Sequence, residues 1–156
     1  MEEYEVQFLE RAVQLSKEGS SQGLGMPFGA VIAKDNKIIA ETANLSFVNC
    51  DPTAHAEVSA IRQACSALKS RDLTGCDLYT SCYPCAMCMA AIYWASISRV
   101  YYAAPKVSFS ERWDRLEASL IPELNKPDSE KSIPVIHVPA LAQEAQRVAE
   151  EWFVRR

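Results

Sequence analysis

The chain has 156 residues, of which 49% are hydrophobic and 23% charged, and its formal net charge at pH 7 is −4. A chain of this length is expected to form a single domain, residues 1–156, and to bury about two-thirds of the surface that its unfolded form exposes. The acidic balance argues against a nucleic-acid-binding protein, because proteins that bind phosphate backbones usually present a basic face.

The composition also indicates a cellular location. The first residues are acidic and lack the basic-then-apolar pattern of a secretory signal, and no apolar stretch of 18 residues is present. Thiols of proteins without an export signal are normally reduced. We therefore expect a cytoplasmic protein, without membrane association, whose six cysteines are available as metal ligands.

Helices and strands are expected to alternate along the chain. In chain order, the hydrophobic periodicity predicts a helix at 4–18, strands at 29–33 and 37–43, a helix through 57–68, a strand at 77–81, a helix at 85–94, a strand at 99–104, a helix at 111–121, a strand at 133–138 and a helix at 141–153. This alternation predicts an α/β domain in which helices cover both faces of one sheet.

Individual residues set several of these boundaries. Gly19 is expected to end the first helix. Thr53 can cap the second helix, with Asp51 as the alternative. Pro84 suits the start of the third helix, whereas Pro134 places the last strand at a sheet edge or makes it irregular.

The most informative segments are His55-Ala56-Glu57 and Pro84-Cys85-Ala86-Met87-Cys88. One imidazole and two thiolates make three zinc ligands. A structural zinc site closes with four protein ligands, whereas a catalytic site leaves the fourth position for water. A carboxylate two residues after the histidine is well placed to carry a proton beside the metal. The pattern predicts an open zinc site with ligands His55, Cys85 and Cys88, and Glu57 as the catalytic proton carrier.

The predicted helices give this site a mechanism. His55 and Glu57 fall in the first turn of one helix, and Cys85 and Cys88 in the first turn of another. The positive ends of the two helix dipoles favour anionic thiolates, and the spacing of three puts both sulfurs on the same helix face. The chemistry expected of such a site is hydrolytic deamination of an amidine-like C(=N)–NH₂ group.

Two other readings of the cysteines are weaker. A redox pair would leave the segment 55–57 unexplained. A closed structural zinc site needs a fourth thiolate, and the remaining cysteines do not form a second Cys-x-x-Cys pair.

The stretches 27–31, 51–62, 79–88 and 91–95 resemble the cytidine deaminase-like superfamily, and within it the bacterial guanine deaminases. The resemblance runs from about Pro27 to Val138. It implies a three-layer α/β/α sandwich with a five-stranded mixed sheet and one zinc ion per chain. It also implies a homodimer whose C-terminal segments are exchanged to close the partner's site.

The resemblance further implies roles for five residues in binding a nucleobase. Asn44 matches an asparagine that hydrogen-bonds the purine, although it could instead be a turn residue. Phe28 and Trp94 match aromatics that pack on the base, and Phe28 could equally be a core residue. Ala56 would contribute backbone groups. Asp114 either takes the place of a substrate-reading acid of that family or lies on a helix face.

The chain departs from the guanine deaminase pattern at two substrate-reading positions. Tyr83 stands where these enzymes usually carry glutamate, and the stretch 111–115 holds one acid between the two arginines, where they carry two adjacent aspartates. We therefore expect a zinc-dependent hydrolytic deaminase of a free nucleobase, with guanine to xanthine as the leading reaction. The alternatives are another aminopurine, a nucleoside or cytosine, then a tRNA adenosine deaminase, and last a non-catalytic zinc-binding subunit.

Overall fold

The computed structural model describes residues 6–106 and 110–154. The chain divides into two compact units, residues 1–117 and 118–156, and each is described by itself. Within the described residues, no helix is both long enough and apolar enough to cross a membrane.

The first unit is built on a mixed sheet, as the sequence predicts. Its strands are β1 (Gly29–Lys34), β2 (Lys37–Ala43), β3 (Asp77–Cys82) and β4 (Arg99–Ala104), in the order β2-β1-β3-β4. The central strand β1 pairs antiparallel with β2 and β3, whereas β3 and β4 run parallel. Parallel pairing requires a crossover, and the segment between β3 and β4 supplies it as a helix.

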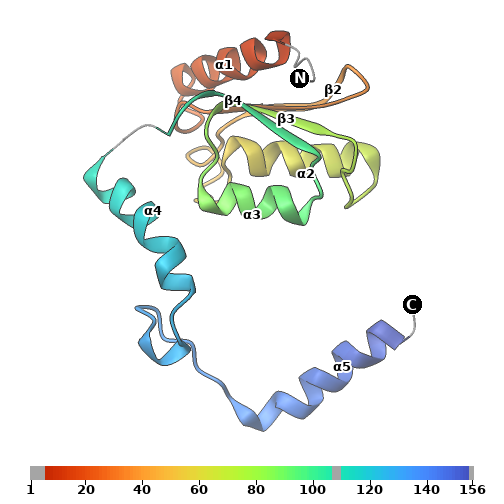
Figure 1. The fold of residues 1–156 in the computed structure, drawn as a ribbon, viewed down its shortest axis with the longest axis vertical. Coiled ribbons are helices and arrows are strands. Elements are labelled where there is room, and N and C mark those ends of the chain that lie inside the picture. The colour runs from red at the N-terminus through yellow and green to blue at the C-terminus, as the bar shows by residue number, and fades with distance from the viewer. Residues whose placement is uncertain (1–5, 107–109, 155–156) are drawn as a thin grey trace. The chain divides into compact units, whose positions relative to one another are not determined.

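Helices cover both faces of this sheet, which confirms the three-layer architecture. Helix α1 (Val6–Ser21) lies on one face, and α2 (Ala56–Leu68) and α3 (Ala86–Trp94) lie on the other (Figure 1). Because side chains alternate along a strand, Val31 and Tyr79 pack with α1 whereas Ile32 and Leu78 pack with α2. This alternation also directs Thr80, two residues after Leu78, toward the α2 side.

At two helix ends, the residues predicted to set the boundary do not do so. Helix α1 runs past Gly19 to Ser21. A Cβ on Gly19 would lie 2.3 Å from the Cβ of Ala43, so the glycine allows close packing of α1 on β2 and does not end the helix. The predicted caps of α2 were wrong. Its N-cap is His55, and the backbone NH and Oγ1 of Thr53 both donate to Asp51 Oδ1, at 2.7 Å each, which forms a turn ahead of the helix.

The second unit is helical and lacks the predicted fifth strand. Helix α4 (Glu111–Leu124) leads into it, followed by the short 3₁₀ helices η1 (Asp128–Glu130) and η2 (Pro139–Leu141), and by α5 (Ala142–Val154). The sheet of the described residues has four strands, so the prediction of a strand at 133–138 was wrong. Pro134 has no NH to donate, and no described strand offers this segment a ladder.

Candidate metal centre

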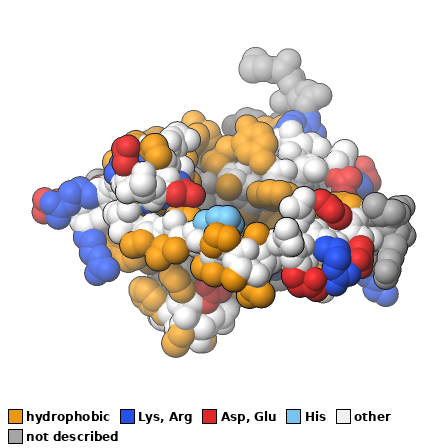
Figure 2. Space-filling view, turned by 90° about the horizontal axis from the view of Figure 1, so that it is seen from below, with side chains coloured by type: hydrophobic (Ala, Val, Ile, Leu, Met, Phe, Trp, Pro, Cys, Tyr) orange, Lys and Arg blue, Asp and Glu red, His pale blue; other side chains and the backbone are white. Residues whose placement is uncertain are grey.

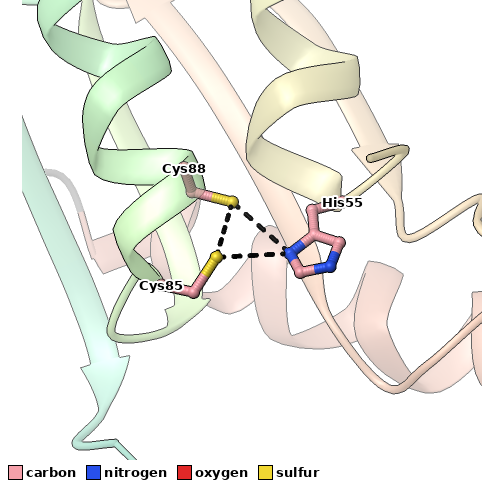
Figure 3. A group of neighbouring side chains, drawn as sticks. All are labelled: His55, Cys85 and Cys88. Atoms are coloured by element: carbon pink, nitrogen blue, oxygen red, sulfur yellow. Dashed lines mark hydrogen bonds between the residues drawn. The ribbon is translucent and has the colours of Figure 1, made fainter. Parts of the chain in front are cut away.

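Three side chains from two helix starts meet at one point. His55 and Cys85 are the N-cap residues of α2 and α3, and their carbonyls accept the first helical hydrogen bonds from Ser59 and Met89. Cys88 lies one turn into α3. Figure 3 shows Nδ1 of His55 turned toward both sulfurs, at 3.6 Å from Cys85 Sγ and 3.5 Å from Cys88 Sγ, with the sulfurs 3.5 Å apart.

This triangle of ligand atoms fits a tetrahedral zinc ion. Zn–S bonds of about 2.3 Å and Zn–N bonds of about 2.0–2.1 Å at tetrahedral angles place neighbouring ligand atoms about 3.6–3.8 Å apart. The observed separations of 3.5–3.6 Å are close to these values without any rearrangement. Among the described residues, His55, Cys85 and Cys88 are also the group of potential ligands that converges within 4.8 Å. A nitrogen and two thiolate donors favour zinc over magnesium or calcium.

The electrostatics of the cluster favour a bound cation. The pKa of Cys85 is lowered to about 4, first because of its hydrogen bond with Cys88 and also because His55 lies beside it. The pKa of Cys88 is raised, first by the same hydrogen bond with Cys85 and then by burial. A coordinated dication would hold both sulfurs as thiolates, since metal-bound thiols are deprotonated.

The carboxyl group of Glu57 lies beside this cluster in the interior. Its side chain is only 5% exposed, and burial raises its pKa above the ordinary value. Its Oε2 lies 3.4 Å from Cys88 Sγ, and its Oε1 accepts a hydrogen bond of 3.1 Å from Thr80 Oγ1. Glu57 is thus adjacent to the predicted metal position yet shielded from bulk water.

Asn44 is buried next to the segment that carries His55. The residue after Asn44, Leu45, donates its backbone NH to the carbonyl of Ala54, which is the residue before His55. This bond holds the segment that carries Asn44 against the segment that carries His55. Its Oδ1 accepts from the NH of Met26 at 3.3 Å, and from the NH and the hydroxyl of Ser46 at 3.0 and 2.6 Å. Two of these donors are backbone amides, which cannot accept, so the amide orientation is forced.

The other side of the same amide has no partner. Nδ2 of Asn44 is buried and makes no hydrogen bond, the one such side-chain atom in the described part of the chain. An unsatisfied buried donor costs roughly 1–3 kcal/mol, and native proteins rarely retain one without a use. Nδ2 of Asn44 is therefore a donor whose acceptor none of the described residues supplies, and a bound molecule can provide one.

Comparison with known proteins gives the chemistry of this centre. Residues 2–104 match the family model of the cytidine and deoxycytidylate deaminase zinc-binding region. The chain belongs to this deaminase family. The match covers the sheet, α2 and α3, and so includes all three candidate zinc ligands and Glu57. The protein is therefore a zinc-dependent aminohydrolase, and the metal expected at His55, Cys85 and Cys88 is zinc.

Individual relatives extend the similarity beyond the zinc-binding region. The chain is 50% identical over 132 residues to the guanine deaminase of Bacillus subtilis, an overlap of 84% of this chain and 83% of the relative. The crystal structure of that enzyme has a TM-score of 0.82 at 43% identity, covering 96% of this chain and 94% of the other. The tRNA-specific adenosine deaminase of Agrobacterium fabrum is 48% identical, but over 51% of this chain and 52% of its own.

The structure places the remaining residues predicted to bind a base in different surroundings. Ala56 is fully buried as the first residue of α2, between His55 and Glu57. Phe28 is half-buried against the core, and its carbonyl accepts from the NH of Asn44. Trp94 ends α3 and is 89% exposed. It lies six residues after Cys88, about 9 Å along the helix axis. It borders a surface hollow with Arg71 and Ser96, separate from the zinc ligands.

Asp114 lies in the first turn of α4, half-buried, with its backbone NH donating to the carbonyl of Ser110. Its role in substrate binding stays a prediction.

Two side chains that contact the predicted site residues were missed from the sequence. Thr80 binds Glu57, and Ser46 binds Asn44. Both are short hydroxyl residues, which occur at so many turns and strands that they give no signal on their own. The one available signal was that Thr80 is a polar residue on the inward face of a strand that is otherwise buried.

Proposed function

We propose that the protein catalyses the zinc-dependent hydrolytic deamination of guanine to xanthine and ammonia. The observation that carries this substrate is the buried donor of Asn44, which lacks an acceptor and precedes Leu45, the residue that pairs with Ala54 just before His55. Guanine presents a carbonyl oxygen on the same ring as the amino group that is replaced. Adenine has a single amino group, which would itself have to face the metal, and it offers no carbonyl oxygen to this donor. The 50% identity to a guanine deaminase over most of the chain supports the same substrate.

Different residues of the site have different roles in this reaction. His55, Cys85 and Cys88 would hold zinc, which when bound lowers the pKa of water and so supplies a nucleophile at neutral pH. Glu57 accepts the proton released when that nucleophile forms, and returns it to the leaving amine so that ammonia departs. Its buried position keeps bulk water from competing for this proton, and burial raises its pKa, which makes it a stronger base than an exposed glutamate.

Replacing Glu57 by glutamine tests this reaction directly. The change keeps the size of the side chain and an oxygen for Thr80, but removes the group that carries the proton. We expect ammonia release from guanine to fall by about 10²–10⁴-fold, with zinc content unchanged. Glu10→Gln, at an exposed position of α1, should leave turnover intact. Unchanged turnover of the Glu57→Gln variant would contradict the proposed mechanism.

We also propose that the enzyme is a cytoplasmic homodimer, with residues 1–156 acting as one deaminase domain whose C-terminal segment is exchanged between protomers. Figure 2 shows hydrophobic side chains at the surface among scattered charges. In the second unit, Ile133, Ile136 and Phe153 are each more than 70% exposed, and none of residues 118–153 is buried. So much exposed apolar surface supports contact with a second copy.

A further inference from the structure

Thr80 is a fully buried hydroxyl residue of β3 that faces the proton carrier. Its Oγ1 lies 3.1 Å from Glu57 Oε1 and 3.1 Å from the carbonyl oxygen of Cys82. We propose that Thr80 is the positioning residue that holds the carboxyl group of Glu57 in the orientation that catalysis requires. This inference rests on the proposed function, because it assigns the orientation of the residue that carries the proton.

The two oxygens of Glu57 have different neighbours. Oε1 is bound by the hydroxyl of Thr80 from the sheet, and Oε2 lies 3.4 Å from Cys88 Sγ on the side of the zinc ligands. The last torsion of a glutamate side chain has a broad energy profile, so the carboxyl plane is not fixed by the side chain itself. A single hydrogen bond to Oε1 removes this freedom and directs Oε2 toward the metal position.

Thr80 is itself held in place. A hydroxyl group has one proton and two lone pairs, so Thr80 Oγ1 donates either to Glu57 or to the carbonyl of Cys82 at any moment. Cys82 is the last residue of β3, and the NH of Tyr83 that follows donates to the carbonyl of Ala104 at the end of β4. The hydroxyl therefore sits on a rigid part of the sheet, and a rigid support is what a precisely oriented catalytic group needs.

Two variants distinguish a role of the Thr80 hydroxyl in positioning Glu57 from a role of Thr80 in the packing of the core. Thr80→Val keeps the shape of the buried side chain and removes the hydroxyl, whereas Thr80→Ser keeps the hydroxyl and removes the methyl group. We expect Thr80→Val to lower kcat for guanine by about 10–100-fold, as misplaced catalytic groups do, while KM and zinc content stay within about twofold of the wild type. Thr80→Ser should retain kcat within about threefold, despite a lower melting temperature.

Any of three results would overturn the inference. Two are kinetic: a wild-type kcat in Thr80→Val, or an equal loss of kcat in both variants. The third is loss of zinc from Thr80→Val. Crystal structures of the zinc-loaded proteins provide a readout that does not need turnover. The Glu57 carboxyl group should leave its wild-type orientation in Thr80→Val and keep it in Thr80→Ser. If the wild type deaminates no base, the proposed function fails, and an unmoved Glu57 in Thr80→Val overturns the inference separately.

Discussion

At the scale of single residues, this site depends on which polar atoms have a hydrogen-bond partner within the described structure and which do not. Oδ1 of Asn44 has three donors and Nδ2 has no acceptor. His55 Nδ1 and the two sulfurs lie at zinc-ligand separations. Both groups of atoms can bind a ligand, but of different kinds. The nitrogen and sulfur atoms at the starts of α2 and α3 suit a cation, and the Asn44 amide suits a hydrogen-bond acceptor.

The first residue-scale prediction concerns the metal. Cys88→Ser replaces a thiolate ligand of the predicted zinc by a much poorer one, so we expect zinc content to fall from about one ion per chain to well below one. Metal analysis of the dialysed protein measures it. Cys82→Ser is the matched control, because Cys82 lies in the same segment but donates to the carbonyl of Pro105. Equal zinc in both variants would contradict the ligand assignment.

The second residue-scale prediction concerns the base. Asn44→Asp keeps an oxygen for Met26 and Ser46 and exchanges the unpaired donor for an acceptor that would oppose the guanine carbonyl. We expect the KM for guanine to rise by about 10–100-fold, which corresponds to roughly 1–3 kcal/mol for a lost buried hydrogen bond, with zinc content unchanged. Asn49→Asp, at an exposed position nearby, is the control. A KM equal to that of the wild type would remove Asn44 from the substrate site.

Sequence spacing sufficed to predict that His55, Cys85 and Cys88 lie together, because a helix start fixes both the direction and the separation of the side chains that follow. It could not predict Thr80 or Ser46. Their roles depend on which strand or loop lies opposite, and that is decided by tertiary packing. The orientation of the Asn44 amide was equally beyond the sequence, since the backbone NH of Met26 reaches it from 18 residues away.

At the scale of elements, the hydrophobic periodicity predicted the first four strands and all five α-helices, because apolar residues recur at strand or helix spacing in each. The failures have local causes. His55 replaced Thr53 as N-cap because Thr53 is already engaged by Asp51. The strand expected at 133–138 has alternating apolar residues but no neighbouring strand within the described part of the chain, and a strand without a ladder is not stable alone.

One element-scale prediction concerns the pH dependence of stability. Arg11 on α1 makes two hydrogen bonds to Glu41 on β2, at 2.9 and 2.7 Å. The hydrogen bond from Arg11 lowers the pKa of Glu41, so the pair stabilises the fold above the ordinary pKa of 4.5 and this contribution is lost as the pH falls below that value. Since both side chains are about one-third exposed, we expect Arg11→Met to cost less than about 1 kcal/mol of unfolding free energy at pH 7.

Urea unfolding of the wild type and Arg11→Met at pH 7 and pH 3 measures this difference. It should be smaller at pH 3, which lies below the ordinary pKa of a glutamate, than at pH 7. Lys17→Met, at an exposed position of the same helix, controls for the loss of a positive charge. A difference that grows toward acid pH would contradict the assignment.

At the scale of the whole molecule, exposed apolar surface argues for assembly. Large hydrophobic side chains are exposed in both units, among them Phe47, Tyr93 and Trp94 in the first and Ile133, Ile136 and Phe153 in the second. We expect light scattering to give a mass about twice the 17.4 kDa of one chain, and the melting temperature to rise with protein concentration, as it does for a folded dimer. A single-chain mass at micromolar concentration would contradict the proposed dimer.

The central claim is that this zinc-dependent deaminase acts on guanine, and the direct test is product formation by the zinc-loaded protein. Guanine, adenine, cytosine and a tRNA anticodon stem-loop should be supplied separately, and xanthine, hypoxanthine, uracil and inosine measured by chromatography. The proposed function predicts rapid conversion of guanine to xanthine, with the other three turned over far more slowly. Conversion of the stem-loop or of cytosine without conversion of guanine would contradict it.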